Sequence, residues 1–337
     1  MYILGIESSC DETSAAVIEI DAEKRKILSN IVASQIDIHR LYGGVVPEIA
    51  SRAHIEAISS ITYEALEKAG LKIDDIGAIA VTAFPGLIGA LLVGVNFAKS
   101  LAYSRNIPLV AVNHMKAHVA ASYLENEDLK HPFVSLVVSG GHTSIYKVSD
   151  YTKFEEIGAT RDDAAGEAFD KIGRVIGLPY PGGAAMDKLA YEGDTNAIAL
   201  PTPAIPGDSL DFSFSGIKTA MLNYINSETQ KGNEINAANV AASYTARIVD
   251  ALVKKTSLAL DKTEAKTLVM AGGVAANSHI RSALAGLCEK RGVRFVTPSI
   301  KLCGDNAAMV AAAGYFEFVK GKTADTSLNA SACDNWD

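Results

Sequence analysis

Two histidines four residues apart, His114 and His118, follow an apolar run at 108–112 and open a helix-like sequence. Side chains at positions i and i+4 share one face of a helix, so both imidazoles could reach the same metal ion. Asp305, just before a second apolar run, is the best candidate for a third ligand. Two histidines and a carboxylate leave coordination positions open, as in non-haem iron and catalytic zinc sites. The alternative is that His114 or Asn113 caps the helix and His118 is a buried structural ring, because this spacing alone is a weak pattern.

The composition predicts a large globular protein. The chain has 337 residues, enough for two domains, and its 48% hydrophobic and 21% charged residues argue against disorder. The four cysteines form no CxxC pair and the N-terminal sequence has no basic leader, so we expect a cytoplasmic protein that crosses no membrane. A net charge of −8 opposes a polyanion. By composition alone an RNA role is disfavoured, and a nucleic-acid partner would need a local basic patch or a helper protein.

The chain consists of two related halves. Residues 2–18 and residues 134–146 each combine an apolar strand, a turn of small residues and a second strand. Each half then supplies a strand that enters a glycine-rich loop and a helix, at 78–89 and at 267–277. Such loops let backbone N–H groups approach an anion, so we expect a phosphate or nucleotide cleft. The alternative is two ordinary hairpins at the edges of two sheets. A mostly helical insertion is expected at about 150–262.

Several acids could take part in chemistry. Asp163, Glu167 and Asp170 have the i, i+4, i+7 spacing of one helix face and could bind ribose hydroxyls or metal-bound water. A solvated acidic face explains that spacing equally well. Asp11 and Glu12 follow the first hairpin tip, where a carboxylate could orient a water, a metal or an attacking amine. Turn formation, which favours Asp, is the alternative for this pair.

Other positions could contact a flat or phosphorylated ligand. The glycines of the turn at 180–183 could pass close to such a ligand, and Asp187 follows one helical turn later. Asn277 could bind a base, although capping its own helix is the default role. Lys218 is a candidate phosphate contact.

Nine ordered motifs together resemble one family, the tRNA threonylcarbamoyladenosine transferases of the bacterial TsaD type, once described as O-sialoglycoprotein endopeptidases. The resemblance covers nearly the whole chain. The motifs are GIESSCDETSAAV (5–17), GGVVPEIASRAH (43–54), HMKAH (114–118), VVSGGHTS (137–144), DDAAGEAFDKIGR (162–174), YPGG (180–183), DFSFSGIKT (211–219), AGGVAAN (271–277) and CGDNAAM (303–309).

This resemblance implies a fold and a reaction. The fold is the duplicated α/β fold shared by actin, hexokinase and the heat-shock ATPases (the ASKHA fold), with two lobes around a nucleotide cleft. We place the N-terminal lobe at 1–129 and the C-terminal lobe, with its helical insertion, at 130–337. The reaction moves a threonylcarbamoyl group from threonylcarbamoyl-AMP to N6 of adenosine 37 in tRNAs that read codons starting with A.

The resemblance also implies site residues and cofactors. His114, His118 and Asp305 match the family's metal ligands, generally for Fe(2+) and in some members for Zn(2+), and Asp11 and Glu12 match acids needed for activity. An adenine nucleotide, as threonylcarbamoyl-AMP, AMP or ATP, is expected in the cleft. Contacts to this substrate are implied for Val138, Ser139, Gly140, Gly141, His142, Asp170, Gly183, Asp187 and Asn277.

The implied partners are tRNA, a TsaB-like paralogue that forms a heterodimer through N-terminal helices, and a TsaE-like ATPase. We expect the isolated chain to bind tRNA weakly, with a basic rim among Arg40, Arg52, Lys171, Arg174 and Lys218. An ATP-dependent small-molecule kinase of the same fold is the alternative function. A metalloprotease would need a glutamate beside a ligand histidine, where Met115 stands. A nucleotide-gated scaffold without catalysis is a third alternative.

The sequence departs from the family pattern at one loop. The usual Thr-x-Gly-Pro-Gly-Leu is here Thr-Ala-Phe-Pro-Gly-Leu at 82–87, so the ring of Phe84 stands beside the predicted cleft loop. It could alter the loop or a partner contact, but it touches none of the proposed ligands. The polar tail after residue 320 is expected to be loosely held.

Overall fold

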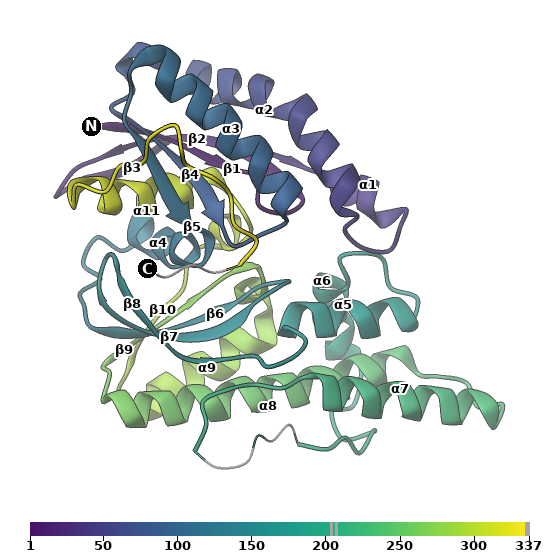
Figure 1. The fold of residues 1–337 in the computed structure, drawn as a ribbon. Coiled ribbons are helices and arrows are strands. Elements are labelled where there is room, and N and C mark those ends of the chain that lie inside the picture. The colour runs from purple at the N-terminus through teal and green to yellow at the C-terminus, as the bar shows by residue number, and fades with distance from the viewer. Residues whose placement is uncertain (203–204, 206–207, 334–337) are drawn as a thin grey trace. The chain divides into compact units, whose positions relative to one another are not determined.

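The computed structural model describes residues 1–202, 205 and 208–333, which fold into two compact units. Unit 1 comprises residues 1–131 and 150–153 together with the chain from 298 on. Unit 2 comprises residues 132–149 and 154–297. Residues 298–333, which we placed in the second lobe from the sequence, therefore pack within unit 1. Figure 1 shows the elements of both units.

Each unit contains a five-stranded sheet, and the two sheets have the same strand order. In unit 1 the order is β3-β2-β1-β4-β5, with β1 antiparallel to β2 and parallel to β4. In the other sheet the order is β8-β7-β6-β9-β10, with β6 antiparallel to β7 and parallel to β9. The predicted duplication is thus confirmed strand by strand. The strands are β1 (Tyr2–Glu7), β2 (Glu12–Ile20), β3 (Arg25–Ser34), β4 (Ala78–Phe84), β5 (Leu109–Asn113), β6 (Phe133–Val138), β7 (Thr143–Asp150), β8 (Lys153–Ala159), β9 (Thr267–Ala271) and β10 (Arg294–Val296).

Helices cover both faces of the unit 1 sheet. Figure 1 shows α2 and α3 on one face and α4 and α11 on the other. Because side chains alternate along a strand, Leu4 and Ile6 of β1 enter the cluster packed by α3, whereas Gly5 faces α11. A Cβ at Gly5 would lie 2.1 Å from the carbonyl oxygen of Ala307, so only glycine lets α11 approach this closely. The helices are α1 (Ile36–Arg40), α2 (Pro47–Ala69), α3 (Ile88–Arg105), α4 (His114–Glu125), α10 (Ile300–Cys303) and α11 (Ala307–Val319).

The helices of unit 2 follow its first three strands. Strand β8 lies within the predicted helical insertion of about 150–262, and the helical part begins after it. The long helix α8 contacts α6, α7 and α9. The helices are α5 (Ala165–Val175), α6 (Gly182–Leu189), α7 (Ser215–Gln230), α8 (Ala237–Thr263) and α9 (Ser278–Arg291). In the described part of the chain, none of the helices is both long and apolar enough to span a membrane.

The polar tail lies along the unit 1 sheet, so the prediction of a loosely held tail is wrong for residues 321–333. The N–H of Ala324 donates to the carbonyl of Leu109 at 2.8 Å, and the N–H of Ser331 donates to the carbonyl of Ala83 at 2.9 Å. Phe84 packs against the same apolar cluster as the tail's leucine and two alanines. The residue that departs from the family pattern therefore helps to cover the same apolar cluster that the tail covers.

Candidate functional site

The two histidines are presented by the first two turns of α4 (His114–Glu125). Asn113, the last residue of β5, caps this helix, since its side-chain oxygen accepts from the N–H groups of Met115 at 2.8 Å and Lys116 at 3.0 Å. The capping role that the sequence offered to either Asn113 or His114 is therefore taken by Asn113. His114 and His118 are both buried, and their ring centroids lie 4.5 Å apart.

Asp305 joins the two histidines from the other end of the chain. Its Oδ1 lies 3.5 Å from Nε2 of His114 and 3.3 Å from Nε2 of His118. It precedes α11, whose cap Asn306 accepts from the N–H of Met309 at 3.1 Å. One ligand atom from each of the three residues lies within 4.8 Å of the others, so the three could hold one metal ion.

The donor set fits a divalent cation. Burial lowers the pKa of His118, and the neighbouring His114 lowers it further, which favours the neutral imidazole that metal binding requires. Neither ring nitrogen of His118 forms a hydrogen bond within the described residues, although both are buried. Buried polar atoms normally have a partner, and a metal ion between His118 and Asp305 would supply one.

Glu7, which the sequence did not single out, completes the surroundings of His114. It ends β1 and is fully buried, with Oε2 3.0 Å from Nδ1 of His114. The hydroxyl of Thr82 donates to the same oxygen at 2.7 Å, and the N–H of Ser9 donates to Oε1 at 2.6 Å. Burial by itself raises the pKa of Glu7, but His114 and Thr82 lower it overall. The one sequence signal was a carboxylate that ends an apolar strand.

The predicted acid pair lies at the turn between β1 and β2. Asp11 is buried, and its backbone carbonyl accepts from the N–H of Gln35 at 3.0 Å. Glu12 accepts from the hydroxyl of Ser34 at 3.1 Å. Burial, then the charges of Asp11 and Asp305, raises the pKa of Glu12 to about 9. Asp305 thus links the acid pair electrostatically to the histidines.

Five of the predicted substrate contacts form the tip of the β6–β7 hairpin in unit 2: Val138, Ser139, Gly140, Gly141 and His142. The N–H of Ser139 donates to the carbonyl of His142 at 2.8 Å, and the N–H of His142 donates to the hydroxyl of Ser139 at 3.1 Å. A Cβ at Gly140 or Gly141 would meet nothing within 4 Å. The two glycines therefore expose backbone that a ligand could approach.

The β9–α9 loop approaches the hairpin strand β6 closely. Gly272 lies in the left-handed region at φ 94°, and a Cβ there would be 2.3 Å from the carbonyl oxygen of Val138. Asn277, at the end of this loop, accepts from the N–H of Ile280 at 3.0 Å and so caps α9. The capping alternative considered for Asn277 is therefore observed.

The remaining predicted contacts, Asp170, Gly183 and Asp187, tie helices together within unit 2. Asp170 accepts from the N–H of Gly183 at 3.1 Å, which joins α5 to the first turn of α6. Asp187 accepts from the N–H and the hydroxyl of Ser278, both at 3.0 Å, at the start of α9. These carboxylates join the starts of α6 and α9 to neighbouring helices, and their binding role stays a prediction.

The proposed acidic helix face is not present as predicted. Helix α5 begins at Ala165, so Asp163 precedes it. Asp163 forms ion pairs with Lys171 at 2.8 Å and with Lys218. Lys218, considered as a phosphate contact, is thus held by a carboxylate 55 residues away in the chain.

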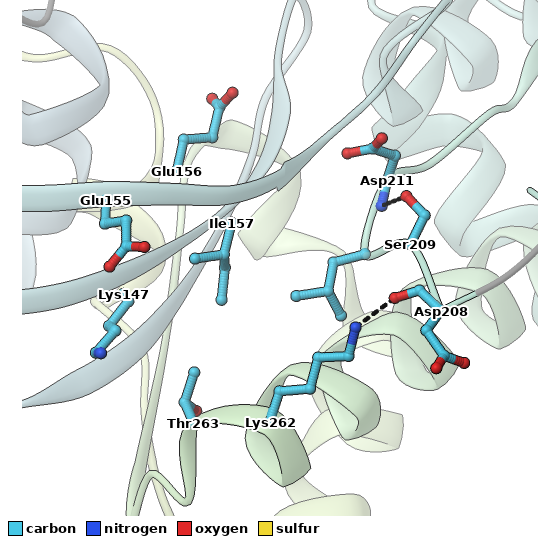
Figure 2. Close-up of a pocket in the computed structure, with 10 residues that line it drawn as sticks. Lys147, Glu155, Glu156, Ile157, Asp208, Ser209, Asp211, Lys262 and Thr263 are labelled. Atoms are coloured by element: carbon cyan, nitrogen blue, oxygen red, sulfur yellow. Dashed lines mark hydrogen bonds between the residues drawn. The ribbon is translucent and has the colours of Figure 1, made fainter.

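A separate cavity of about 530 Å³ lies in unit 2 beside β8 and the end of α8. Figure 2 shows Lys262 donating to the carbonyl of Asp208, and the N–H of Asp211 donating to the hydroxyl of Ser209. None of the residues predicted for chemistry lines this cavity. The lining residues are Lys147, Glu155, Glu156, Ile157, Asp208, Ser209, Leu210, Asp211, Lys262 and Thr263.

Comparison with known sequences gives one consistent result. The sequence pattern of the tRNA N6-adenosine threonylcarbamoyltransferase family, TsaD, matches residues 26–312. A protein of that name from Clostridium perfringens (strain ATCC 13124) is 55% identical over 328 residues, covering 97% of this chain and 96% of the relative. Another from Clostridium botulinum (strain Kyoto) is 53% identical over the same share of both chains.

Comparison with solved structures gives the fold. Component A of (R)-2-hydroxyglutaryl-CoA dehydratase from Acidaminococcus fermentans matches with a TM-score of 0.55 at 17% identity, covering 95% of this chain and 99% of that one. HypF from T. kodakarensis matches with a TM-score of 0.62 at 13% identity, covering 95% of this chain and 48% of that one. With the duplicated strand order, these similarities confirm the predicted actin, hexokinase and heat-shock-ATPase-like fold.

Proposed function

Because this chain belongs to the tRNA N6-adenosine threonylcarbamoyltransferase family, we propose that it transfers a threonylcarbamoyl group from threonylcarbamoyl-AMP to N6 of adenosine 37 in tRNAs that read codons starting with A. The observation that carries the proposal is 53–55% identity to transferases of this name over 97% of the chain. The kinase alternative is not favoured, because the similar sequences described above are named transferases. A kinase of this fold would also need no histidine pair.

In unit 1, one divalent metal ion would be held by His114, His118 and Asp305. We propose Fe(2+) as the preferred ion and Zn(2+) as the alternative. Nitrogen and carboxylate donors with open positions suit both ions. A bound ion would supply Lewis-acid stabilisation of negative charge and a template for the anionic donor. The support for this site is the convergence of three ligand atoms and the burial of both His118 nitrogens, which form no hydrogen bond within the described residues.

The acid pair of unit 1 would accept the proton that the reaction releases. The adenine N6 attacks the activated carbonyl carbon of the donor, and a carbon–nitrogen bond forms. The bond from that carbon to the phosphate oxygen breaks, and AMP leaves with the electron pair. One proton of the amine then passes to Asp11 or Glu12. Because burial and the charges of Asp11 and Asp305 raise the pKa of Glu12 to about 9, Glu12 already holds a proton near neutral pH, and the acceptor role would fall to Asp11.

The hairpin tip of unit 2 would bind the donor's anionic part. Gly140 and Gly141 leave room for close approach of phosphate to their N–H groups, which can stabilise negative charge. The surrounding loops are fixed by the contacts of Asp170, Asp187 and Asn277. Positioning of the donor by a rigid loop lowers the entropic part of the barrier.

We further propose that the chain works in the cytoplasm with tRNA, a TsaB-like paralogue and a TsaE-like ATPase. The net charge of −8 disfavours tight binding of tRNA by the chain alone. Two basic residues considered for tRNA contact already pair with acids on the surface, Arg40 with Asp37 at 3.1 Å and Arg52 with Glu48 at 3.2 Å. Helper proteins would therefore supply part of the tRNA-binding surface.

A single-turnover assay tests the proposed reaction. Purified chain, the two helper proteins and synthetic threonylcarbamoyl-AMP are mixed with a tRNA transcript, and modified nucleosides are measured by mass spectrometry. The matched control transcript carries guanosine at position 37, which has no N6 amine. We expect product from the adenosine transcript alone. If the adenosine transcript gives no product and the chain instead phosphorylates a sugar or acetate with ATP, the kinase would be favoured.

A further inference from the structure

The side chain of His114 is held at both of its nitrogens, and the two contacts differ. Nε2 faces Asp305 at 3.5 Å, on the side of the proposed metal ion. Nδ1 faces Glu7 at 3.0 Å, on the side of the sheet core. A neutral imidazole carries one proton, so one nitrogen donates and the other offers a lone pair. The group that accepts the proton decides which nitrogen is available to a metal.

Glu7 has no freedom to point elsewhere. Its side chain is fully buried, and β1 pairs with β4 so that Thr82 stands next to it. The hydroxyl of Thr82 and the N–H of Ser9 each donate to one of its oxygens, at 2.7 and 2.6 Å. Both of these donors are uncharged, and the third contact, with Nδ1 of His114 at 3.0 Å, falls on the same oxygen as that of Thr82.

We propose that Glu7 is a positioning residue of the metal centre: its carboxylate accepts the Nδ1 proton of His114 and so turns the lone pair of Nε2 toward Asp305 and the ion. This inference rests on the proposed metal site in unit 1. A carboxylate on the far nitrogen of a ligand histidine fixes its tautomer and ring orientation and raises its basicity. Glu7 itself contributes no ligand atom.

Ser9 offers the alternative acceptor for the same proton. Its hydroxyl lies 3.2 Å from Nδ1 of His114, farther than the carboxylate of Glu7. A hydroxyl is also the weaker acceptor, since hydrogen bonds to an ionised group are about twice as strong as those between neutral groups. We therefore assign the orienting role to Glu7 and expect Ser9 to contribute little.

The test measures metal affinity in Glu7→Gln by competition between metal-free protein and a chromophoric chelator for Zn²⁺, and by the visible spectrum of bound Co²⁺. The amide removes the charge but keeps the size of the side chain. We expect affinity to fall about 10- to 100-fold, the usual effect of losing such a partner, with a changed Co²⁺ spectrum. The matched control is Glu317→Gln, another buried acid of unit 1, which pairs with Lys322 at 2.9 Å. It should bind Zn²⁺ as the unmodified chain does.

Two further variants keep the inference testable if Glu7→Gln does not fold, which circular dichroism of the metal-free protein would show. Thr82→Val loosens Glu7 without touching His114 and should weaken Zn²⁺ binding at least about threefold, whereas Ser9→Ala should change it less. If Glu7→Gln folds and its affinity for Zn²⁺ is unchanged, the inference is overturned. If Glu7→Gln does not fold, an unchanged Zn²⁺ affinity of Thr82→Val overturns it instead. An unmodified chain that binds no Zn²⁺ or Co²⁺ would instead refute the metal site itself.

Discussion

Replacing Glu12 by glutamine should change how the stability of the metal-free protein depends on pH. In the folded chain, burial and the charges of Asp11 and Asp305 raise the pKa of Glu12 from 4.5 to about 9. In the unfolded chain these neighbours are gone and the carboxyl ionises near its ordinary value. Between these two pKa values the folded state holds a proton that the unfolded state has lost. The free energy of unfolding must therefore fall as the pH rises through this window.

The size of the effect follows from the same shift. One proton difference changes the free energy of unfolding by about 1.4 kcal/mol per pH unit. Two pH units between about pH 5.5 and pH 7.5 would then give about 3 kcal/mol as an upper limit. Glu12 is only partly buried and keeps its hydrogen bond from Ser34, so we expect about 1–2 kcal/mol. Glu12→Gln exchanges no proton and should lack this component.

Urea unfolding of both proteins at several pH values, with a chelator present, measures the difference. The chelator keeps cations from neutralising Asp305. The stability of Glu12→Gln relative to the unmodified chain should therefore rise by about 1–2 kcal/mol between about pH 5.5 and pH 7.5. Glu56→Gln, on the exposed side of α2, is the control and should reproduce the parent curve. Equal pH dependence in parent and Glu12→Gln would show that the carboxyl ionises normally in the fold.

Three further predictions concern stability and are each measured by urea unfolding. Gly5→Ala places a carbon 2.1 Å from a backbone oxygen of α11 and should cost about 3 kcal/mol or more, whereas Gly141→Ala, with nothing within 4 Å, should cost little; equal costs would refute the packing argument. Removing residues 323–337 deletes the hydrogen bond from Ser331 to β4 and should destabilise unit 1; an unchanged unfolding midpoint would mean that the tail adds nothing. Asp162→Ala removes the acceptor of four hydrogen bonds at the start of α7 and should lower the free energy of unfolding by about 2 kcal/mol. Burial raises the pKa of Asp162, but hydrogen bonds from Ser213 and Ser215 lower it overall, so this loss should shrink as the pH falls. A loss that does not depend on pH would contradict this.

Local sequence patterns carried much of the candidate site. The prediction that His114 and His118 share a helix face holds because Asn113 caps α4, so that the helix begins at His114 and contains both residues. The place of Asp305 beside them depends on α11 packing against the unit 1 sheet, and no local pattern contains that contact. The duplicated strand order was predictable because each half repeats an apolar run, a small-residue turn and another apolar run.

What local patterns missed involves partners distant in the chain. Glu7 differs from a solvent-exposed strand end only because Thr82 and His114 surround it, 75 and 107 residues later. Asp163 fitted a helical periodicity, but its ion pair with Lys218 depends on where α7 packs. The tail is polar and small, yet its backbone hydrogen bonds hold it to β4 and β5 regardless of side-chain polarity. Backbone pairing of this kind leaves little trace in composition.

Elemental analysis of the chain purified without chelators tests most directly whether His114, His118 and Asp305 form a metal centre. We expect about one equivalent of iron or zinc per unmodified chain, as three such ligands would bind, and almost none in His118→Ala. His131→Ala, whose ring pairs with Tyr123 outside the cluster, should keep the metal. A metal-free parent chain, or equal metal in His118→Ala, would contradict the proposed centre.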